Sequence, residues 1–196
     1  TNAVVIVATI RALKYHGGAT LSSLRTEDLT ALKAGFDNLD KHIENMKYFG
    51  FKPIVSINRF DSDTEAELDL LFKYYKEQNV KIAVNEGWAK GGEGALDLAE
   101  KVLESVKDSP AYFNPIYELS WSFEEKIDAI CKKLYGADHV EYTIKAKNQM
   151  EKITKLGFGN LAVCIAKTQK SLSDDPNKRG RPKGFTVKIR EIELSS

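Results

Sequence analysis

Pro53-Ile54-Val55-Ser56-Ile57-Asn58, followed directly by Arg59 and Phe60, is the stretch that best indicates the fold. A short apolar run bounded by proline and polar residues is typical of a parallel strand buried on both faces. A helix is predicted to start at Asp63 or Thr64, and its apolar face carries Leu68, Leu71, Phe72 and Tyr75. Residues 81–85 then form another apolar run. This strand, helix, strand order predicts a parallel sheet.

The same alternation extends in both directions from this stretch. Residues 3–10 are almost all apolar and predict a first strand that leads into a loop. From Thr26 to Gly50, apolar residues recur at helical spacing, and a further helix is predicted from about 95 to 106. Residues 1–107 therefore predict an α/β fold with a doubly wound, mostly parallel sheet.

The rest of the chain is less regular. Pro110 and Pro115 mark a connector rich in aromatic residues, and helices are predicted over 122–134 and 145–156. Residues 161–167 read as a fourth, buried strand and 185–190 as a fifth, with a polar loop over 168–183 between them. We therefore expect a core over 1–107, an inserted or appended helical part over 108–160, and returning strands over 161–196.

Composition excludes some classes of function. The 196 residues carry a formal net charge of +1, with 42% hydrophobic and 29% charged residues, so no global field attracts nucleic acid or an anionic membrane. No apolar run reaches the ~18 residues that a membrane span needs. Cys131 and Cys164 are the only cysteines and lie in apolar stretches, which favours a reducing compartment over a disulfide scaffold.

Two aromatic residues follow neighbouring predicted strands. Phe60 comes after the second strand, and Trp88 lies 28 residues later in a glycine-rich run that extends from Glu86 to Gly94. Ligands of open parallel sheets bind beyond the carboxyl ends of the strands, so the two rings could clamp a planar heterocycle. The alternative is that Phe60 caps the core and Trp88 packs under a loop.

Four segments resemble the formate–tetrahydrofolate ligase (formyltetrahydrofolate synthetase) family, in the order in which that family has them. The resemblance covers essentially the whole chain. The four segments are Ala8-Thr9-Ile10-Arg11-Ala12-Leu13-Lys14-Tyr15-His16-Gly17-Gly18; Ile57-Asn58-Arg59-Phe60 with Asp63-Thr64-Glu65-Ala66-Glu67; Trp88-Ala89-Lys90-Gly91-Gly92-Glu93-Gly94; and Ala166-Lys167-Thr168-Gln169 with Ser171-Leu172-Ser173-Asp174-Asp175-Pro176. The resemblance implies a fold of the P-loop NTPase-like type with an additional helical part.

The chain departs from the family's pattern in two respects. Enzymes of the family are much longer and have an N-terminal phosphate-binding P-loop, whereas no Gly-x-x-x-x-Gly-Lys-Ser/Thr pattern occurs here. We therefore expect an internal or C-terminal fragment that is inactive alone. In addition, Lys170 stands where the family's Lys-Thr-Gln-x-Ser run is expected to have an aromatic residue.

The resemblance implies ATP-dependent formylation of tetrahydrofolate at N10 through formyl phosphate. Phe60 and Trp88 match the family's pair of rings around the pterin, and Val84 and Gly87 would line the same slot. The full-length enzyme would use ATP with Mg²⁺ and a monovalent cation, act in the cytoplasm and form a homo-oligomer. No membrane or nucleic-acid partner is expected.

Further polar residues are weaker candidates. Arg11, Lys167, Gln169 and Ser173 are possible nucleotide or anion contacts, and the catalytic residues are not assigned. Asp174-Asp175-Pro176 could bind magnesium, but an ordinary turn explains these residues better. No metal site is expected, because His16, His42 and His139 lie far apart in the sequence.

Two other functions remain open. Arg179-Gly180-Arg181-Pro182 looks like the core of an AT-hook, which binds narrow A·T minor grooves, although a loop between two predicted strands is an unusual place for one. The chain could also be a structural fragment that binds no ligand.

Overall fold

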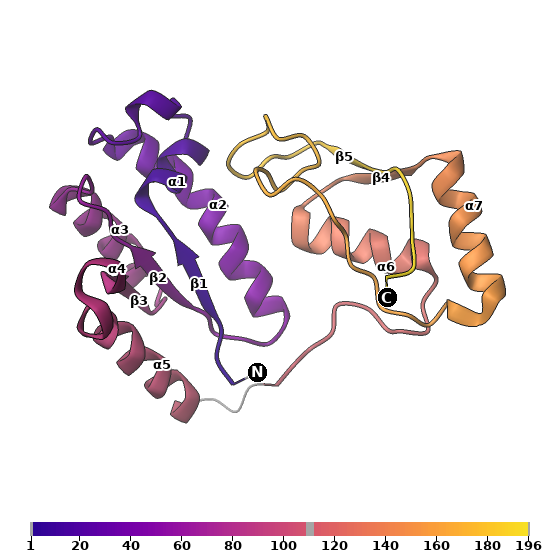
Figure 1. The fold of residues 1–196 in the computed structure, drawn as a ribbon, viewed down its shortest axis with the longest axis horizontal. Coiled ribbons are helices and arrows are strands. Elements are labelled where there is room, and N and C mark those ends of the chain that lie inside the picture. Colours follow the sequence, from indigo (N-terminus) through magenta and orange to yellow (C-terminus); the bar gives the residue numbers. More distant parts are fainter. Residues whose placement is uncertain (1, 109–111, 196) are drawn as a thin grey trace. The chain divides into compact units, whose positions relative to one another are not determined.

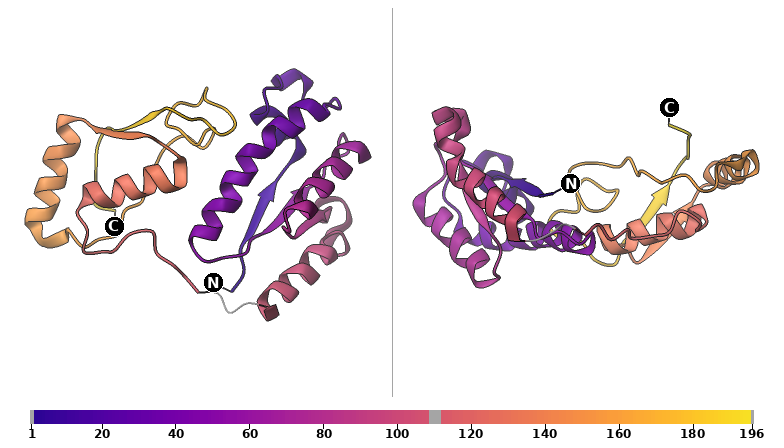
Figure 2. Two further views of the ribbon diagram at one scale, coloured as in Figure 1. Left: turned by 180° about the vertical axis from the view of Figure 1, so that it is seen from behind. Right: turned by 90° about the horizontal axis from the view of Figure 1, so that it is seen from below.

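A computed structural model describes residues 2–108 and 112–195 and divides the chain into two compact units. The first unit is Thr1–Asn114 and the second is Pro115–Ser196. Figures 1 and 2 show the helices and strands of each unit. Pro110, which was expected to mark the connector, lies outside the described residues.

The first unit alternates strands with helices along the chain (Figure 1). Its elements are β1 (Val5–Ala8), α1 (Ile10–His16), the 3₁₀ turn η1 (Leu21–Ser23), α2 (Leu29–Tyr48), β2 (Ile54–Asn58), α3 (Glu65–Glu77), β3 (Ile82–Asn85), α4 (Gly87–Lys90), the 3₁₀ helix η2 (Gly91–Ala95) and α5 (Leu96–Asp108). Side-chain caps set the start of the two longest core helices. Asp28 accepts a hydrogen bond from the Ala31 N–H at α2, and Thr64 forms a capping box with Glu67 at α3.

The strands of the first unit form one parallel sheet in the order β1-β2-β3. Val5 pairs with Ile54 at one end of the first ladder and Ala8 with Ile57 at the other. In the second ladder, Asn58 pairs with Asn85. The prediction of an α/β fold with parallel strands is therefore confirmed, and all three strands end at the same edge of the sheet.

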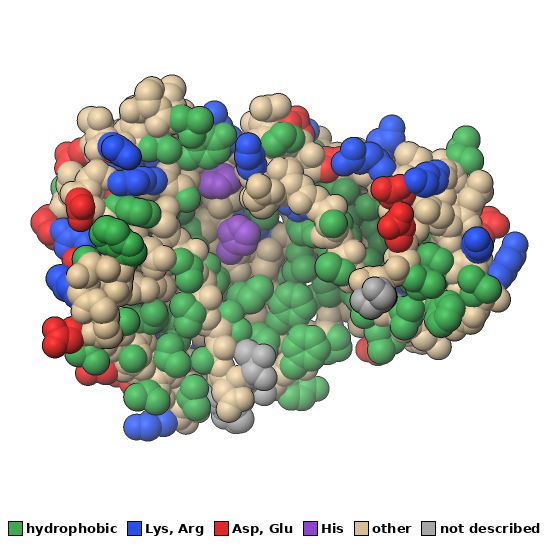
Figure 3. Space-filling model, viewed as in Figure 1, with side chains coloured by type: hydrophobic (Ala, Val, Ile, Leu, Met, Phe, Trp, Pro, Cys, Tyr) green, Lys and Arg blue, Asp and Glu red, His purple; other side chains and the backbone are tan. Residues whose placement is uncertain are grey.

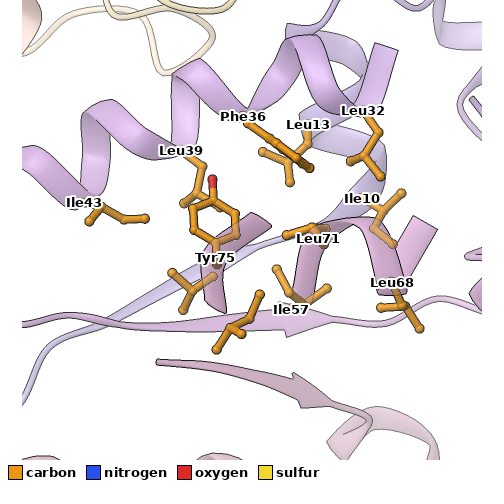
Figure 4. Close-up of a cluster of buried hydrophobic side chains, with 12 residues drawn as sticks. Ile10, Leu13, Leu32, Phe36, Leu39, Ile43, Ile57, Leu68, Leu71 and Tyr75 are labelled. Carbon is orange, nitrogen blue, oxygen red and sulfur yellow. The ribbon is translucent and has the colours of Figure 1, made fainter. Parts of the chain in front are cut away.

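The main core lies between this sheet and helices α1, α2 and α3 (Figure 4). Val55 of β2 belongs to this core. Ile57 points into the core from the same strand, and Phe36 and Tyr75 fill it from α2 and α3. Their ring centroids are 5.7 Å apart. The apolar spacing of these helices in the sequence is thus explained by burial against one face of the sheet.

The opposite face of the sheet is covered unevenly. Ile54, Ser56 and Ala83 are fully buried there, and α5 contacts the two strands to which they belong. On β1, however, the residues that pair with Ile54 and Ser56 are Val5 and Val7, which are 37% and 60% exposed. Figure 3 shows hydrophobic side chains at the surface in several places. Apolar surface is therefore open on this face of β1.

The second unit combines two helices with a small sheet. Its elements are α6 (Phe123–Ala129), continued by the π-helical η3 (Ile130–Tyr135); β4 (His139–Tyr142); α7 (Ile144–Ile153), continued by the π-helical η4 (Thr154–Phe158); and β5 (Thr186–Ile189). Ser122 caps α6 through a capping box with Glu125, and Thr143 accepts the Ala146 N–H at α7. The helices predicted over 122–134 and 145–156 are therefore present.

One core holds this second unit together. β4 and β5 pair in parallel, with His139 opposite Thr186. The core contains side chains from both helices, such as Ile127 of α6 and Met150 of α7, together with Val187 of β5. The parts expected over 108–160 and 161–196 are thus not separate from residue 115 onward, because both contribute to this core.

The structure differs from the sequence analysis in three places. Residue 10, expected as the end of the first strand, begins helix α1, and strand β4 was not predicted. Residues 161–167 were expected to be a buried strand but are assigned to none. The backbone of Val163, in the middle of this segment, bonds to a side chain and not to a strand. The Tyr117 hydroxyl accepts from the Val163 N–H at 3.0 Å and donates to the Val163 carbonyl at 3.5 Å.

Among the described residues, no helix is both long enough and apolar enough to cross a membrane.

Candidate functional site

The carboxyl ends of β2 and β3 are tied together at the edge of the sheet. Asn58 and Asn85 are the last residues of these strands, and the Asn85 amide donates a hydrogen bond to Asn58 Oδ1 at 3.2 Å. One residue further, the Arg59 N–H donates to the Asn85 carbonyl at 3.1 Å. The chain segments that carry Phe60 and Trp88 therefore start from adjacent, hydrogen-bonded positions.

A tight turn holds Phe60 at the end of β2. The Phe60 N–H donates to Asp63 Oδ2 at 2.8 Å, and the Asp63 N–H donates back to the Phe60 carbonyl at 2.9 Å. Thr64 caps α3 immediately afterwards. The Phe60 ring is 41% exposed, so its backbone is fixed while part of the ring can meet a ligand.

Arg11 packs against this ring. Its guanidinium carbon lies 4.0 Å from the centroid of Phe60, and Nη2 donates to Ser62 Oγ at 3.0 Å. Sequence reasoning placed Arg11 at this edge of the sheet as a possible anion contact. The structure places its guanidinium on the Phe60 ring, and a contact with nucleotide or anion stays a prediction.

Trp88 lies in the short helix α4, directly after β3. Its side chain is 95% exposed, so both faces of the indole are accessible. Asn85 Oδ1 accepts from the Gly87 N–H at 2.9 Å and so fixes the start of this helix. An aromatic side chain that is held at its base but open on its surface is suited to stacking on a flat ligand.

The glycines around Trp88 are needed for a closed loop. The Glu86 N–H donates to the Gly94 carbonyl at 2.9 Å, which joins the two ends of the loop. A Cβ on Gly94 would lie 2.5 Å from the Glu86 backbone, and one on Gly87 would lie 2.9 Å from Asn85 Oδ1. Local packing thus requires glycine at position 94, where the Cβ would meet backbone, whereas a Cβ on Gly87 would meet a side-chain oxygen. Contact of Gly87 with a ligand stays a prediction. Val84, also predicted to line the slot, packs against the main core.

Charged groups flank the two aromatic residues. Arg59 forms ion pairs with Glu65 at 2.5 Å and with Glu86 at 3.9 Å, and Lys90 pairs with Glu86 at 2.6 Å. The hydrogen bond from Lys90 lowers the pKa of the Glu86 carboxyl, and the charge of Arg59 acts in the same direction. These surface pairs, in which Arg59 and Glu86 are half-buried, add little to stability, and their positive and negative charges balance.

Asp63 is the buried carboxylate of the site. It is 5% exposed, and burial raises its pKa above the ordinary 3.8; the charge of Glu67 adds to this shift, while the Phe60 N–H and Arg11 oppose it. A carboxyl whose pKa is raised by folding stabilises the folded state below its unfolded pKa and loses that contribution as the pH rises through the folded pKa.

We therefore expect Asp63→Asn to gain stability relative to the wild type as the pH rises above 3.8. The amide oxygen can keep the bond from the Phe60 N–H, and the ionised form no longer has to be buried. Urea unfolding at a series of pH values measures the difference, and Asp61→Asn on the exposed neighbouring residue controls for loss of charge. A difference that stays constant or shrinks with rising pH would contradict this assignment.

The polar motif that starts at Lys167 lies in the second unit and forms a loop with several internal hydrogen bonds. Lys167 Nζ donates to the Thr168 and Ser171 carbonyls and lies 4.8 Å from the Tyr135 ring centroid. Burial lowers the pKa of this amine. Ser173 is fully buried, and its hydroxyl donates to the Asp175 carbonyl. These contacts account for both side chains within the loop.

The whole chain matches one protein family. The family model described as formate–tetrahydrofolate ligase matches residues 1–196. The chain belongs to the formate–tetrahydrofolate ligase family. This membership implies a ligase that uses formate, tetrahydrofolate and ATP.

The ligase motifs fall on both units of the chain. Arg11, Phe60, Val84, Gly87 and Trp88 all belong to the first unit, at or next to the ends of its strands. The predicted contacts Lys167, Gln169 and Ser173 belong to the second unit, and of these three Gln169 is exposed. Nucleotide or anion contacts for these residues stay predictions in this ligase.

The adjacent carboxylates Asp174 and Asp175 of the ligase accept hydrogen bonds from backbone N–H groups. Asp174 Oδ2 accepts from the Lys188 N–H at 3.1 Å, and Asp175 Oδ1 accepts from the Asn177 N–H at 2.9 Å. Within residues 2–108 and 112–195, no three His, Cys, Asp or Glu side chains gather in a way that could hold a metal ion. The arrangement fits a structured turn better than a magnesium cage built from protein ligands alone.

The AT-hook-like segment is also part of this loop. Gly180 is buried and has a φ of 67°, a backbone conformation that favours glycine. An arm that enters a minor groove would have to be free to extend. In the segment Arg179-Gly180-Arg181-Pro182, the buried Gly180 fixes the backbone, while both arginine side chains are exposed.

Sequence reasoning missed three residues that shape the site. Asp63 fixes the Phe60 turn, and Asn58 and Asn85 join the strand ends. A signal was available for each. Both asparagines follow apolar runs directly, and an aspartate three residues after Phe60 is typical of a turn stabilised by its side chain.

Proposed function

We propose that this chain carries the folate-binding side of a formate–tetrahydrofolate ligase and that the pterin stacks between Phe60 and Trp88. The observation that supports this most is the pairing of the two strand ends from which the rings project. Asn58 and Asn85 hold these ends together, while Trp88 is 95% and Phe60 41% exposed. Stacking adds ~0.5–1.5 kcal/mol per aromatic pair beyond the burial of area.

The proposed reaction has two steps. A formate oxygen forms a bond to the γ-phosphorus of ATP, and the bond to ADP breaks, which leaves formyl phosphate. N10 of tetrahydrofolate then bonds to the formyl carbon, the carbon–oxygen bond to phosphate breaks, and N10 loses its proton. Both steps depend on positioning and on neutralising negative charge. The contribution of the first unit is to hold the pterin so that N10 reaches the formyl carbon.

We further propose that the phosphate-binding side is supplied by chain outside these 196 residues. The sequence contains no P-loop pattern, although the parallel sheet of the first unit is compatible with a fold of the P-loop NTPase-like type. On this proposal the 196-residue chain alone does not turn over. The complete enzyme would bind ATP with Mg²⁺ and a monovalent cation, and it would be a cytoplasmic homo-oligomer.

A tetrahydrofolate titration under anaerobic conditions, followed by tryptophan fluorescence, tests the binding proposal. The wild type should show saturable quenching, because the ligand would stack on the exposed Trp88. Trp88→Leu should lose this signal and at least tenfold in affinity, which corresponds to about 1.4 kcal/mol. Equilibrium dialysis measures the affinity of the variant independently of fluorescence.

Trp121→Phe is the matched control, since Trp121 belongs to the second unit and is the only other tryptophan. This variant should retain the quenching. If the wild type is folded and shows neither quenching nor retention of ligand in dialysis, the folate proposal is wrong. The chain would then be a structural piece of the enzyme.

A further inference from the structure

Arg11 lies over a face of Phe60 and not at its edge. A guanidinium carbon in the plane of a phenyl ring could not come closer to the centroid than about 5 Å, because the ring atoms and van der Waals contact intervene. The observed distance is 4.0 Å. One face of Phe60 is therefore occupied by a cation, and the exposed part of the ring belongs to its other face and edge.

The position of Arg11 is set by the fold. Thr9 caps α1 by accepting the Ala12 N–H at 3.1 Å, which fixes the first helical turn and Arg11 within it. Nη2 is held by Ser62, two residues after Phe60. Within the described residues, the buried Nε of Arg11 has no hydrogen-bond partner. Contact with the ring, and not a complete set of hydrogen bonds, thus explains where the guanidinium lies.

We propose that Arg11 is a positioning and specificity-determining residue of the pterin site, and that it makes Phe60 prefer an electron-rich, reduced pterin. This inference rests on the proposed function, in which Phe60 and Trp88 stack on tetrahydrofolate. The guanidinium acts through the ring and does not itself touch the ligand.

Two physical effects carry the proposal. The guanidinium packs against one side of the ring and limits its rotation, so the ring is already oriented before the ligand arrives. A cation on one face also offsets the negative potential of the π-system, which would otherwise repel an electron-rich ligand stacked on the other face. The reduced pterin of tetrahydrofolate is richer in electrons than the oxidised pteridine of folic acid. Arg11 should therefore favour the reduced form.

The test compares tetrahydrofolate with folic acid as ligands of the 196-residue chain, with affinities taken from equilibrium dialysis. Arg11→Met keeps much of the aliphatic packing but removes the cation. It should weaken tetrahydrofolate binding about tenfold and folic acid binding about threefold or less. Arg11→Lys keeps the charge without the planar group, and it should lose two- to threefold for tetrahydrofolate while retaining most of the preference.

Two controls separate this role from a structural one. Arg59→Met removes a different cation, which lies next to Phe60 in the chain and is paired with Glu65 and Glu86. Ser62→Ala removes the hydrogen-bond partner of Arg11. Each should change the ratio of the two affinities by less than twofold. Far-UV circular dichroism and urea unfolding of every variant show whether it is folded.

The outcomes distinguish the two proposals. If the wild type binds tetrahydrofolate and Arg11→Met lowers both affinities equally, or neither, the role assigned to Arg11 is wrong while the folate site stands. If Arg11→Met is unfolded, Arg11→Lys and the wild type decide the matter. A variant Arg11→Lys that keeps the charge but loses most of the preference for tetrahydrofolate, or a wild type that shows no such preference, would equally overturn it. If the folded wild type binds no tetrahydrofolate, the folate site itself is wrong, and the role of Arg11 falls with it.

Discussion

Replacing Lys14 with methionine should lower the free energy of unfolding of the first unit by about 3 kcal/mol or more, since a buried ion pair would lose one partner. Lys14 and Glu67 are both fully buried, and Lys14 Nζ lies 2.7 Å from Glu67 Oε1. Lys14 also donates to the Thr26 carbonyl at 2.8 Å. Methionine fills the volume of the lysine stem, so the loss measures the buried charge and not a cavity.

Glu67 connects three helices, which is why its unpaired charge should be costly. It pairs with Lys14 of α1, accepts the Asp28 N–H at the cap of α2 at 3.2 Å, and accepts the Thr64 N–H at the cap of α3 at 3.1 Å. Hydrogen exchange of the β2 amides during urea titration reports the free energy of unfolding of this unit separately from that of the second.

The matched control is the double variant Lys14→Met/Glu67→Gln. Glutamine can still complete the capping box, and it leaves no unpaired buried charge. The double variant should therefore recover a substantial part of the loss seen in Lys14→Met. If the single variant is as stable as the wild type, or the double variant is the less stable of the two, the charge of Glu67 does not depend on Lys14.

Gly35→Ala should also destabilise the first unit strongly, by about 3 kcal/mol, because two helix backbones touch at this position. A Cβ on Gly35 of α2 would lie 1.9 Å from the Leu13 carbonyl oxygen of α1 and 2.6 Å from its carbon. Gly17 makes the reciprocal approach, where a Cβ would lie 1.7 Å from the Ala31 carbonyl oxygen. Only a separation of the two helices would make room for the methyl group.

The sign of this effect makes the prediction sharp. In a free helix, alanine is more favourable than glycine by about 1 kcal/mol, so propensity alone predicts that Gly35→Ala stabilises α2. Gly92→Ala is the control, since a Cβ there would meet no atom within 4 Å. The same hydrogen-exchange measurement on β2 applies to both variants. Stability equal to or above that of the wild type in Gly35→Ala would show that α1 and α2 do not touch in this way.

Elements with an unambiguous apolar pattern could be predicted from the sequence. The strands at 54–58 and 82–85 and the long helix α2 are patterned because a sheet face and a helix stripe must be buried. The order of these elements also predicts that Phe60 and Trp88 lie at neighbouring strand ends. Periodicity and chain order therefore determine this part of the fold.

Features that depend on residues far away in the sequence could not be predicted from the sequence. Helix α1 has only seven residues and is followed by two glycines, and its buried Lys14 reads as a surface residue until Glu67 is known to face it. Residues 161–167 have the composition of a buried strand, but composition does not reveal that the Tyr117 hydroxyl bonds to the Val163 backbone. The stacking of Arg11 on Phe60 likewise requires the orientation of α1.

The strand order of each unit determines whether its sheet can form during synthesis of the chain. In the first unit every new strand pairs with the one synthesised before it, so the sheet can grow as the polypeptide leaves the ribosome. The sheet of the second unit cannot form strand by strand during synthesis, because β4 pairs with β5. His139 can pair with Thr186 only after Thr186 has been added to the chain. The apolar helix faces of this unit must meanwhile stay uncovered or be held by a chaperone. Translation speed over residues 143–186 should therefore affect the yield of folded second unit more than that of the first.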